Sequence, residues 1–445
     1  MHKINHANIK DWAKNYDGPL FDAILCDPPY ELGFMGKSWD SSGIAFDADM
    51  WADILKLLKP GGHLLAFSGS RTYHRMAVAI EDAGFEIRDQ LIWMYGSGFP
   101  KSLNIGKAVD KIQGNEREDL GEHPYAARRP RTQIESNSKA FDKGTIGTNR
   151  NLTNTKGTSD WEGYGTALKP AHEPCVLARK PLDGTVANNV LKHGTGGLNI
   201  DGTRVGLADG DDTKRVSGGH KTSYIGGSLD KNYDISLQAN RDLGRFPANL
   251  IHDGSDEVEA VFPQTGKSTA RTGHPGGKTF GGSDMGKDVV GQWFGDSGSA
   301  SRFFYCAKSS KSERNAGLEG FEPQITNDGR EKDIDNAFQR GATLRSNHHP
   351  TVKPLSLTKY LATLIKPPTG GRLLVPFSGS GSEMIGALQA GWEYVEGVEL
   401  TEEYIPIAEA RIKYWTNISH KANPKPKSAK KTEPVQIEQQ ELLHI

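Results

Sequence analysis

The stretch Phe21-Asp22-Ala23-Ile24-Leu25-Cys26-Asp27-Pro28-Pro29-Tyr30 joins a short apolar run to a stiff polar turn. Ala23 to Cys26 has the length and apolar character of a strand that is buried on both faces, as in a parallel sheet. In open parallel sheets, ligands bind just beyond the carboxyl ends of the strands. The turn at 27–30 is therefore expected to face a ligand crevice.

The groups on this turn suit a planar heterocycle that carries an amino group. The two prolines fix the backbone and lack an N–H, so the carbonyls of the turn are left free to face a ligand. Asp27 adds acceptors, and Tyr30 adds a ring for stacking. We expect two N–H donors to meet Asp27 and the Pro28 carbonyl while Tyr30 lies against the ring. The alternative is a Pro-Pro turn that only closes a strand.

A glycine-rich turn stands near the other end of the chain. Residues 372–375 have the pattern of a second buried strand, which runs into Pro376-Phe377-Ser378-Gly379-Ser380-Gly381 and then a helix. Residues 394–400 have the pattern of a further strand, with Glu399 near its end. In nucleotide sites, glycines let the backbone approach the ligand, and a carboxylate that ends the next strand binds ribose hydroxyls. The spacing from Gly379 to Glu399 fits that arrangement.

Together these motifs resemble those of the DNA amino-methyltransferases, which methylate adenine N6 or cytosine N4 with S-adenosylmethionine. Asp27-Pro28-Pro29-Tyr30 resembles the catalytic motif, and His349-Pro350-Thr351-Val352-Lys353-Pro354 with 376–381 resembles the cofactor region. This order is the permuted order of the beta class of that family. Residues 33–40, 95–102 and 303–308 are similar to sequence segments of solitary methyltransferases from phages and prophages.

The resemblance implies an α/β Rossmann-like methyltransferase fold that uses S-adenosylmethionine, with permuted motifs and a large loop-rich insertion for target recognition. It implies catalytic roles for Asp27, Pro28, Pro29 and Tyr30. It implies cofactor contacts for a larger set: Asp27, Thr351, Lys353, Pro376, Phe377, Ser378, Gly379, Ser380, Gly381, Glu399 and Leu400. Asn8 is a weaker candidate, and Lys353 could instead be a solvated surface charge.

The chain departs from the family pattern at Val375. Relatives usually carry an acidic residue directly before Pro-Phe, and that acid is expected to help hold the charged end of S-adenosylmethionine. Glu383 stands shortly after the last glycine, where small hydroxyl residues are commoner. We hypothesise that Glu383 partly restores the missing charge.

The expected reaction is methylation of adenine N6 in double-stranded DNA, because Asp rather than Ser opens the tetrapeptide. The target base would be extruded from the duplex, at a cost of a few kcal/mol, and methylated by direct transfer. Cytosine N4 is an alternative, since its amino group also offers two N–H donors. Two others remain: RNA or a protein amide as substrate, and a catalytically silent DNA-binding relative.

Composition limits the remaining choices. The chain has 445 residues, 52 of them glycine, and a formal net charge of −1, so DNA would have to meet local basic patches. Its three scattered cysteines give no disulfide framework and no metal spacing. His252, Asp253, His348 and His349 show no convincing ligand spacing either, so no metal is expected. Neither a transmembrane run nor a signal-peptide pattern is present, which favours the cytoplasm.

We expect four regions along the chain. Residues 1–182 would form the catalytic half of the core, including a mobile loop at 101–170 whose Arg128-Arg129-Pro130-Arg131 could meet a polyanion or remain a solvated loop. Residues 183–345 would recognise the target, 346–416 would bind the cofactor, and 417–445 would be disordered. The resemblance also implies a homodimer or higher homo-oligomer.

Alternating strands and helices predict a parallel sheet in the first region. Helices are expected over 51–58 and 73–83, with Lys59-Pro60-Gly61-Gly62 stopping the first, and strands over 63–67 and 86–95. Residues 171–180 would return the chain to the sheet. His172 and Glu173 could form a catalytic pair, but the sequence places no partner beside them, so a direct chemical role is not expected.

Overall fold

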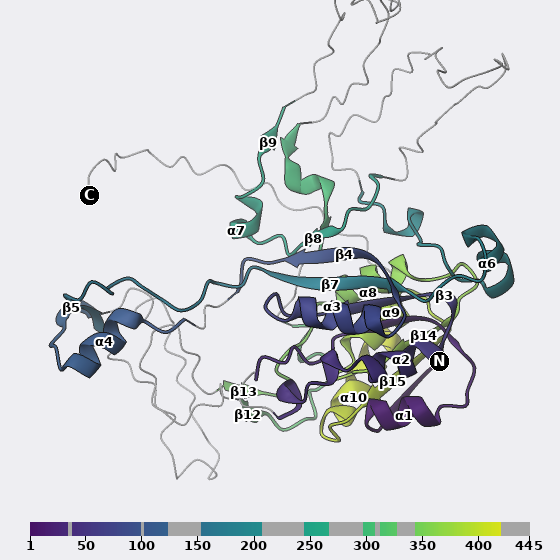
Figure 1. Cartoon of the computed structure of the whole chain (residues 1–445), viewed down its shortest axis with the longest axis horizontal. Coiled ribbons are helices and arrows are strands. Elements are labelled where there is room, and N and C mark those ends of the chain that lie inside the picture. The colour runs from purple at the N-terminus through teal and green to yellow at the C-terminus, as the bar shows by residue number, and fades with distance from the viewer. Residues whose placement is uncertain are drawn as a thin grey trace, which may run out of the picture.

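The computed structural model describes residues 1–33, 38–98, 102–122, 153–206, 244–266, 297–307, 312–326 and 343–419. Within these residues, nine strands form one sheet that runs through the centre of the molecule (Figure 1). Its strands, in spatial order, are β1 (His2–His6), β15 (Tyr394–Glu399), β14 (Arg372–Val375), β2 (Phe21–Cys26), β3 (Leu58–Phe67), β7 (His172–Arg179), β4 (Glu86–Met94), β8 (Leu250–His252) and β11 (Tyr305–Cys306).

The sheet is mixed, so the expectation of a purely parallel sheet was wrong in one strand. β7 runs antiparallel to both neighbours, β3 and β4, and the other strand pairs of the sheet are parallel. The reason lies in the connection. Met94, which ends β4, is paired with His172, which begins β7, so the chain re-enters the sheet at the edge where it left.

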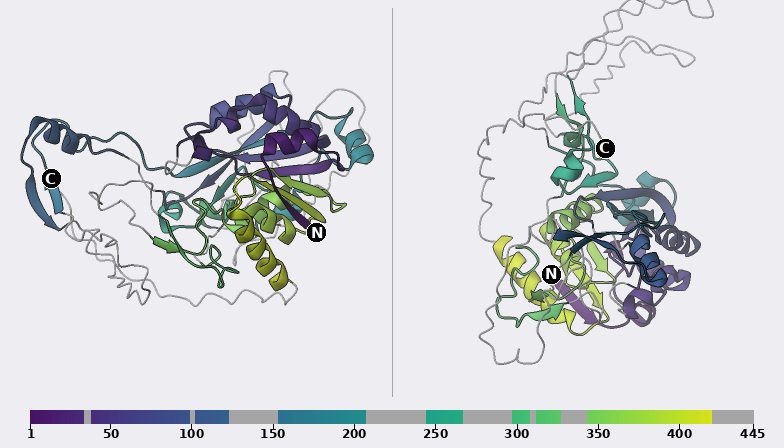
Figure 2. Two further views of the ribbon diagram at one scale, coloured as in Figure 1. Left: turned by 90° about the horizontal axis from the view of Figure 1, so that it is seen from below. Right: turned by 90° about the vertical axis from the view of Figure 1, so that its left-hand side faces the viewer.

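Helices cover both faces of the sheet, as the two further views show (Figure 2). α1 (Ile9–Asn15), α2 (Ala48–Lys56) and α3 (Tyr73–Asp82) pack on one face, against Ile24 and Cys26 of β2. α8 (Leu355–Leu364), α9 (Ser382–Gln389) and α10 (Tyr404–Ser419) cover the other face, where Ala23 and Leu25 point. The alternation of side chains along a strand thus gives β2 two apolar faces, and the fold is a doubly wound α/β fold of the Rossmann-like kind.

The helices and strands of the core mostly begin and end where the sequence patterns predict. The helix predicted at 73–83 is α3, and the strand predicted at 86–95 is β4. Lys59-Pro60-Gly61-Gly62 follows the end of α2, as expected, but these residues belong to β3. Gly61 is held there by hydrogen bonds from its N–H to the carbonyls of Lys180 and Pro181.

Shorter elements lie outside the core, and in the described part of the chain six of their strands pair into three separate two-stranded sheets: β5 (Glu118–Glu122) with β6 (Thr153–Lys156), β9 (Gln264–Thr265) with β10 (Gly298–Ser299), and β12 (Gln324–Thr326) with β13 (Thr343–Arg345). In the segment expected to be a mobile loop, Arg117 pairs with Asp110 and Glu162 and so joins α4 (Ile105–Gln113) to the chain beyond β6. Arg128-Arg129-Pro130-Arg131 lies outside the described residues. β8 and β11, both from region 183–345, extend the sheet. Further short helices are α6 (Val186–His193) and α7 (Asp256–Glu259).

Among the described residues, no helix combines the length and the apolar character that crossing a membrane requires.

Candidate active site

The turn at 27–30 and the glycine turn at 376–381 lie at the same corner of the sheet. β2 and β14 are parallel neighbours, with Leu373 opposite Ala23 and Leu374 opposite Ile24. Their carboxyl ends therefore reach the same edge, where Asp27 follows β2 and residues 376–381 follow β14. Motifs that stand hundreds of positions apart in the sequence meet at this corner.

A buried network of charged groups joins the two motifs. The Nζ atom of Lys353 lies 2.6 Å from Oδ2 of Asp27 and 3.2 Å from Oε2 of Glu173. Lys353 also donates to the hydroxyl of Tyr30 at 3.0 Å, and that hydroxyl donates to Oε2 of Glu173 at 2.9 Å. Lys353 is only 5% exposed, so these interactions are largely shielded from water.

The surroundings fix the protonation of two members of this network. Burial lowers the pKa of Lys353, but the carboxylates of Asp27 and Glu173 outweigh burial and hold that pKa above its ordinary value. Burial and the same two carboxylates raise the pKa of Tyr30 well above its usual range. Lys353 is therefore a cation and Tyr30 a neutral phenol. The rings of Phe67 and Tyr30 lie 4.8 Å and 5.3 Å from Nζ and add cation–π attraction.

One carboxylate oxygen of Asp27 remains free to act. Lys353 occupies Oδ2, whereas Oδ1 is buried and has no hydrogen-bond partner within the described chain. A buried acceptor without a partner is costly, and such groups are usually explained by a function or by a missing ligand. Oδ1 is thus a buried acceptor with room for one more hydrogen bond, which an N–H donor from outside the chain could supply.

The turn after Asp27 is held in place by groups that the motif itself does not include. Asp40 accepts the N–H groups of Tyr30, Glu31 and Leu32, at 2.8, 3.1 and 3.2 Å. Thr72 donates its hydroxyl to the Tyr30 carbonyl at 2.8 Å. Glu31 has a φ of 57°, which is the only positive φ of a non-glycine residue in the described ranges. Backbone strain of this kind is retained where the surroundings enforce it.

The glycine turn brings backbone close to its neighbours. Gly379 has a φ of 48°, and a Cβ atom there would lie 2.8 Å from Nε2 of His349. Its N–H donates to Oε2 of Glu399 at 2.7 Å, while Oε1 accepts the N–H of Thr401 at 2.8 Å. Gly381, with a φ of 81°, is the N-cap of α9. Glu399 is therefore placed beside the loop, as the spacing predicted.

Further buried polar atoms without partners gather around this loop. Among the described residues, none is a partner for Ser378 Oγ, Glu383 Oε1, or the Nε and Nη2 atoms of Arg411. Arg411 is fully buried and donates through Nη1 to Ser380 and Ser382. Burial, with Asp27 as the second cause, raises the pKa of Glu383 to about 7. Acceptors and a cationic donor side by side suit a ligand that carries both an ammonium and a carboxylate, as S-adenosylmethionine does.

The structure places the residues singled out in the sequence in different surroundings. Asp27, Pro28, Pro29, Tyr30, Lys353, Glu399 and the loop 376–381 meet at the corner. Thr351 and Leu400 have exposed side chains, and the Thr351 carbonyl bonds the ring of His349. Val375 is fully buried in the apolar layer beneath α9. Asn8 caps α1, accepting the N–H of Lys10 at 3.0 Å.

Glu173 and Asp40 are site residues whose placement the sequence did not reveal. Glu173 has partners after all, because β7 lies next to β3 and its first residues reach the same edge as Tyr30. Asp40 lies ten positions after Tyr30 in an irregular segment, and no periodic pattern announces its contacts. Phe34 and the side chain of Trp39, which lie in one of the segments similar to phage enzymes, are outside the described residues.

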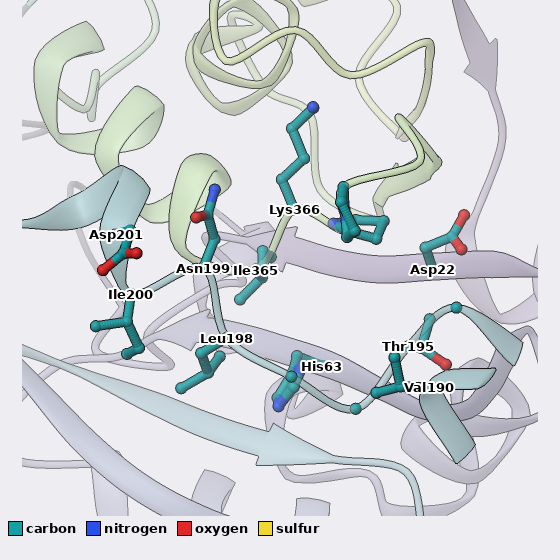
Figure 3. Close-up of a pocket in the computed structure, with 15 residues that line it drawn as sticks. Asp22, His63, Val190, Thr195, Leu198, Asn199, Ile200, Asp201, Ile365 and Lys366 are labelled. Carbon is teal, nitrogen blue, oxygen red and sulfur yellow. The ribbon is translucent and has the colours of Figure 1, made fainter. Parts of the chain in front are cut away.

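A separate cavity of about 420 Å³ lies at the opposite edge of the sheet (Figure 3). Asp22, near the start of β2, lines it together with His63, Leu198 and Lys366. The Asp22 carboxylate is already bonded to Lys59 at 2.7 Å and to the N–H of Arg372 at 2.7 Å. Neither the turn at 27–30 nor the loop at 376–381 lines this cavity, so it is separate from the corner where those two turns meet. No cluster of potential metal ligands occurs in the part of the chain that the structure describes.

Comparison with known proteins finds similarity to DNA methylases in the region that contains the turn at 27–30. The sequence model of the DNA methylase family matches residues 21–195. The type II methyltransferase M.HindIII of Haemophilus influenzae is 27% identical over 147 residues, 32% of this chain and 35% of that protein. YubD of Escherichia coli K12, described as a methylase, is 39% identical over 67 residues, 15% of this chain and 29% of its own length. This chain thus spans about a third of the curated relatives that it matches.

Among solved structures, PvuII DNA methyltransferase (cytosine-N4-specific) aligns with 94% of this chain and 91% of its own. The identity is 10% and the TM-score 0.39, too low to carry an argument about function. The match to the family model is more informative than the structural similarity. It begins at β2 and includes the turn at 27–30, Asp40 and Glu173. By that match over residues 21–195, this part of the chain is similar to the DNA methylase family.

Proposed function

We propose that this protein transfers a methyl group from S-adenosylmethionine to N6 of adenine in double-stranded DNA. The observation that carries the proposal is the state of Asp27. One of its oxygens is held by Lys353, and the other is a buried acceptor with no partner in the described residues, at the corner shared with the glycine loop. An exocyclic amino group supplies the N–H that this oxygen lacks.

Asp27 and Pro28 would activate the amine together. The lone pair of an adenine amino nitrogen is delocalised into the ring, so the nitrogen is a poor nucleophile. When Oδ1 of Asp27 accepts one N–H and the Pro28 carbonyl accepts the other, the nitrogen can pyramidalise and turn its lone pair outward. The same acceptors stabilise the positive charge that develops on nitrogen, and Asp27 can then remove the excess proton.

The residues around the glycine loop fit the cofactor. When bound, S-adenosylmethionine supplies an electrophilic methyl group on a sulfonium. Gly379 and Gly381 allow the backbone to approach a ligand closely, and Glu399 is placed to accept ribose hydroxyls. Arg411 offers buried N–H donors, without partners in the described chain, that suit the carboxylate of the amino-acid end.

Tyr30 would hold the flipped base. The base must leave the duplex to reach a buried acceptor, and stacking on an aromatic ring returns roughly 1–3 kcal/mol. The hydroxyl of Tyr30 is fixed by Lys353 and Glu173, so the ring has little freedom to lose when a base arrives. We further propose that residues 183–345 read the target sequence, and that the enzyme works as a homo-oligomer in the cytoplasm.

Labelled S-adenosylmethionine and unmethylated DNA test the proposal. Wild type should incorporate label into DNA, Asp27→Ala should lose at least about a hundredfold in rate, and the exposed Asp82→Ala should match wild type. Nucleoside analysis of the product should give N6-methyladenine, and N4-methylcytosine would instead assign the alternative base. The proposal fails if wild type labels no DNA, or if Asp27→Ala labels DNA as fast as wild type.

A further inference from the structure

We propose that Glu383 is the carboxylate that receives the ammonium group of the cofactor, and that it gives up a proton when the cofactor binds. This inference rests on the proposed function, since it concerns the same ligand. It assigns to a helix residue the task that relatives give to an acid directly before Pro-Phe. In this chain that position is Val375, which is fully buried in an apolar layer.

The position of Glu383 supports this assignment. Glu383 is the second residue of α9, directly behind the glycine loop, and its side chain is 4% exposed. Its Oε1 atom is buried and has no hydrogen-bond partner among the described residues, like Oδ1 of Asp27. A carboxylate at a helix N-terminus is also stabilised by the helix dipole. The side chain thus brings an unused acceptor to the place where the two motifs meet.

The charged groups that face Glu383 come from several elements. Asp27 from the turn after β2 disfavours its ionisation, whereas Lys353 before α8 and Arg411 of α10 favour it. From β15, Glu399 is already bonded to two backbone N–H groups. From α8, Thr358 donates to the carbonyl of Ser382 rather than to the Glu383 side chain. The carboxylate of Glu383 is therefore near one other carboxylate and two cationic side chains, and it is shielded from water.

This balance leaves Glu383 partly protonated in the unliganded protein at neutral pH. Burial first, and Asp27 second, raise its pKa to about 7. An ammonium group that arrives beside it stabilises the ionised form, so binding drives the proton off. The affinity should then rise with pH, by up to about tenfold per unit below 7, and level off above that pH. A proton taken up by the unliganded site opposes binding.

Calorimetry with S-adenosylhomocysteine tests the proposal without catalysis. This probe carries the same ammonium and carboxylate as the cofactor, whereas 5′-methylthioadenosine carries the nucleoside part alone. For wild type at pH 7, the binding enthalpy of S-adenosylhomocysteine should depend on the ionisation enthalpy of the buffer, which reveals proton release. The affinity for S-adenosylhomocysteine should rise between pH 6 and pH 8, whereas the affinity for 5′-methylthioadenosine should not change with pH.

Glu383→Gln should bind S-adenosylhomocysteine at least about tenfold more weakly than wild type at pH 8 and release no proton, yet bind 5′-methylthioadenosine normally. Glu402→Gln, an exposed glutamate before α10, should match wild type. The inference is overturned if wild type binds without proton release, or if Glu383→Gln keeps the pH dependence. The wild-type measurement decides the matter even if the variant does not fold. Binding of neither probe to wild type would overturn the proposed function itself.

Discussion

The buried Lys353 and the partly buried Asp27 form an ion pair of 2.6 Å across 326 positions of the sequence. The pair connects the segment before α8 to the turn after β2, and it leaves only Oδ1 of Asp27 without a partner among the described residues. Lys353 is therefore not a solvated surface charge, which was the alternative that the sequence left open. In the proposed reaction, this contact leaves Oδ1 of Asp27 as the atom that would accept a proton from the amine.

Replacing Lys353 by Met should destabilise the protein by about 3–5 kcal/mol. The change leaves the largely shielded carboxylates of Asp27 and Glu173, whose side chains are 12% and 21% exposed, without their cation, which costs more than the pair itself contributes. Urea unfolding measures the loss, with the exposed Lys359→Met expected to stay within about 0.5 kcal/mol of wild type. A loss below about 1 kcal/mol would show that the pair is of little structural importance.

Two substitutions at Tyr30 should separate its ring from its hydroxyl. Tyr30→Phe removes the group between Lys353 and Glu173 but keeps the stacking plane, so the KM for DNA should change less than about threefold. Tyr30→Ala removes the ring and should weaken binding of the flipped base by roughly 1–3 kcal/mol. Steady-state kinetics on one duplex compares them. Equal KM values for the two variants would contradict a stacking role.

Gly379→Ala should weaken binding of S-adenosylhomocysteine at least about tenfold. The new Cβ atom would lie 2.8 Å from Nε2 of His349, at a φ of 48° that side chains rarely adopt. His349→Ala in the same chain removes the close contact and should restore part of the affinity, but not the part lost to the backbone conformation. Calorimetry on both variants and on His349→Ala alone checks this, and a double variant no better than Gly379→Ala refutes the contact as the cause.

The stability of the fold should fall when the pH drops from 6.5 towards 4. Burial first, and then Arg179 and Arg88, lower the pKa of His63 to about 4. Between that value and 6.5 the unfolded chain binds the proton that the folded chain refuses, so acid favours unfolding. His63→Gln should lose on the order of 3 kcal/mol less than wild type over this range. Urea midpoints at pH 7 and pH 4 give the comparison, and parallel curves would disprove the role of His63.

The core elements were predictable because local pattern and tertiary environment agree in them. β2 reads as a buried apolar strand, and all six of its residues are buried. α3 lies at Tyr73–Asp82, where the sequence predicted a helix over 73–83. The corner was predictable as well, since strands that end in polar turns at the carboxyl edge of a sheet must bring those turns together when they are neighbours.

The rest depends on strand order and on single contacts that no local pattern encodes. The sequence indicated neither that β7 would lie between β3 and β4 nor that its direction would be reversed, and the role of Glu173 follows from both. Likewise, the match between Asp40 and three N–H groups depends on an irregular loop path. Charges such as Lys353 could be assigned to a region of the molecule from the resemblance, but not to a partner.

The pairing of β2 with β14 has a consequence for biosynthesis. One edge of β2 pairs with β3, which the ribosome makes soon afterwards, but its other edge waits for residues 372–375. At ordinary rates of translation, about 5–20 residues per second, that wait lasts tens of seconds. During it the nascent chain presents an apolar strand with an unpaired edge, which is the kind of surface that chaperones bind. Folding of the catalytic corner should therefore be a late event, completed only after most of the chain has left the ribosome.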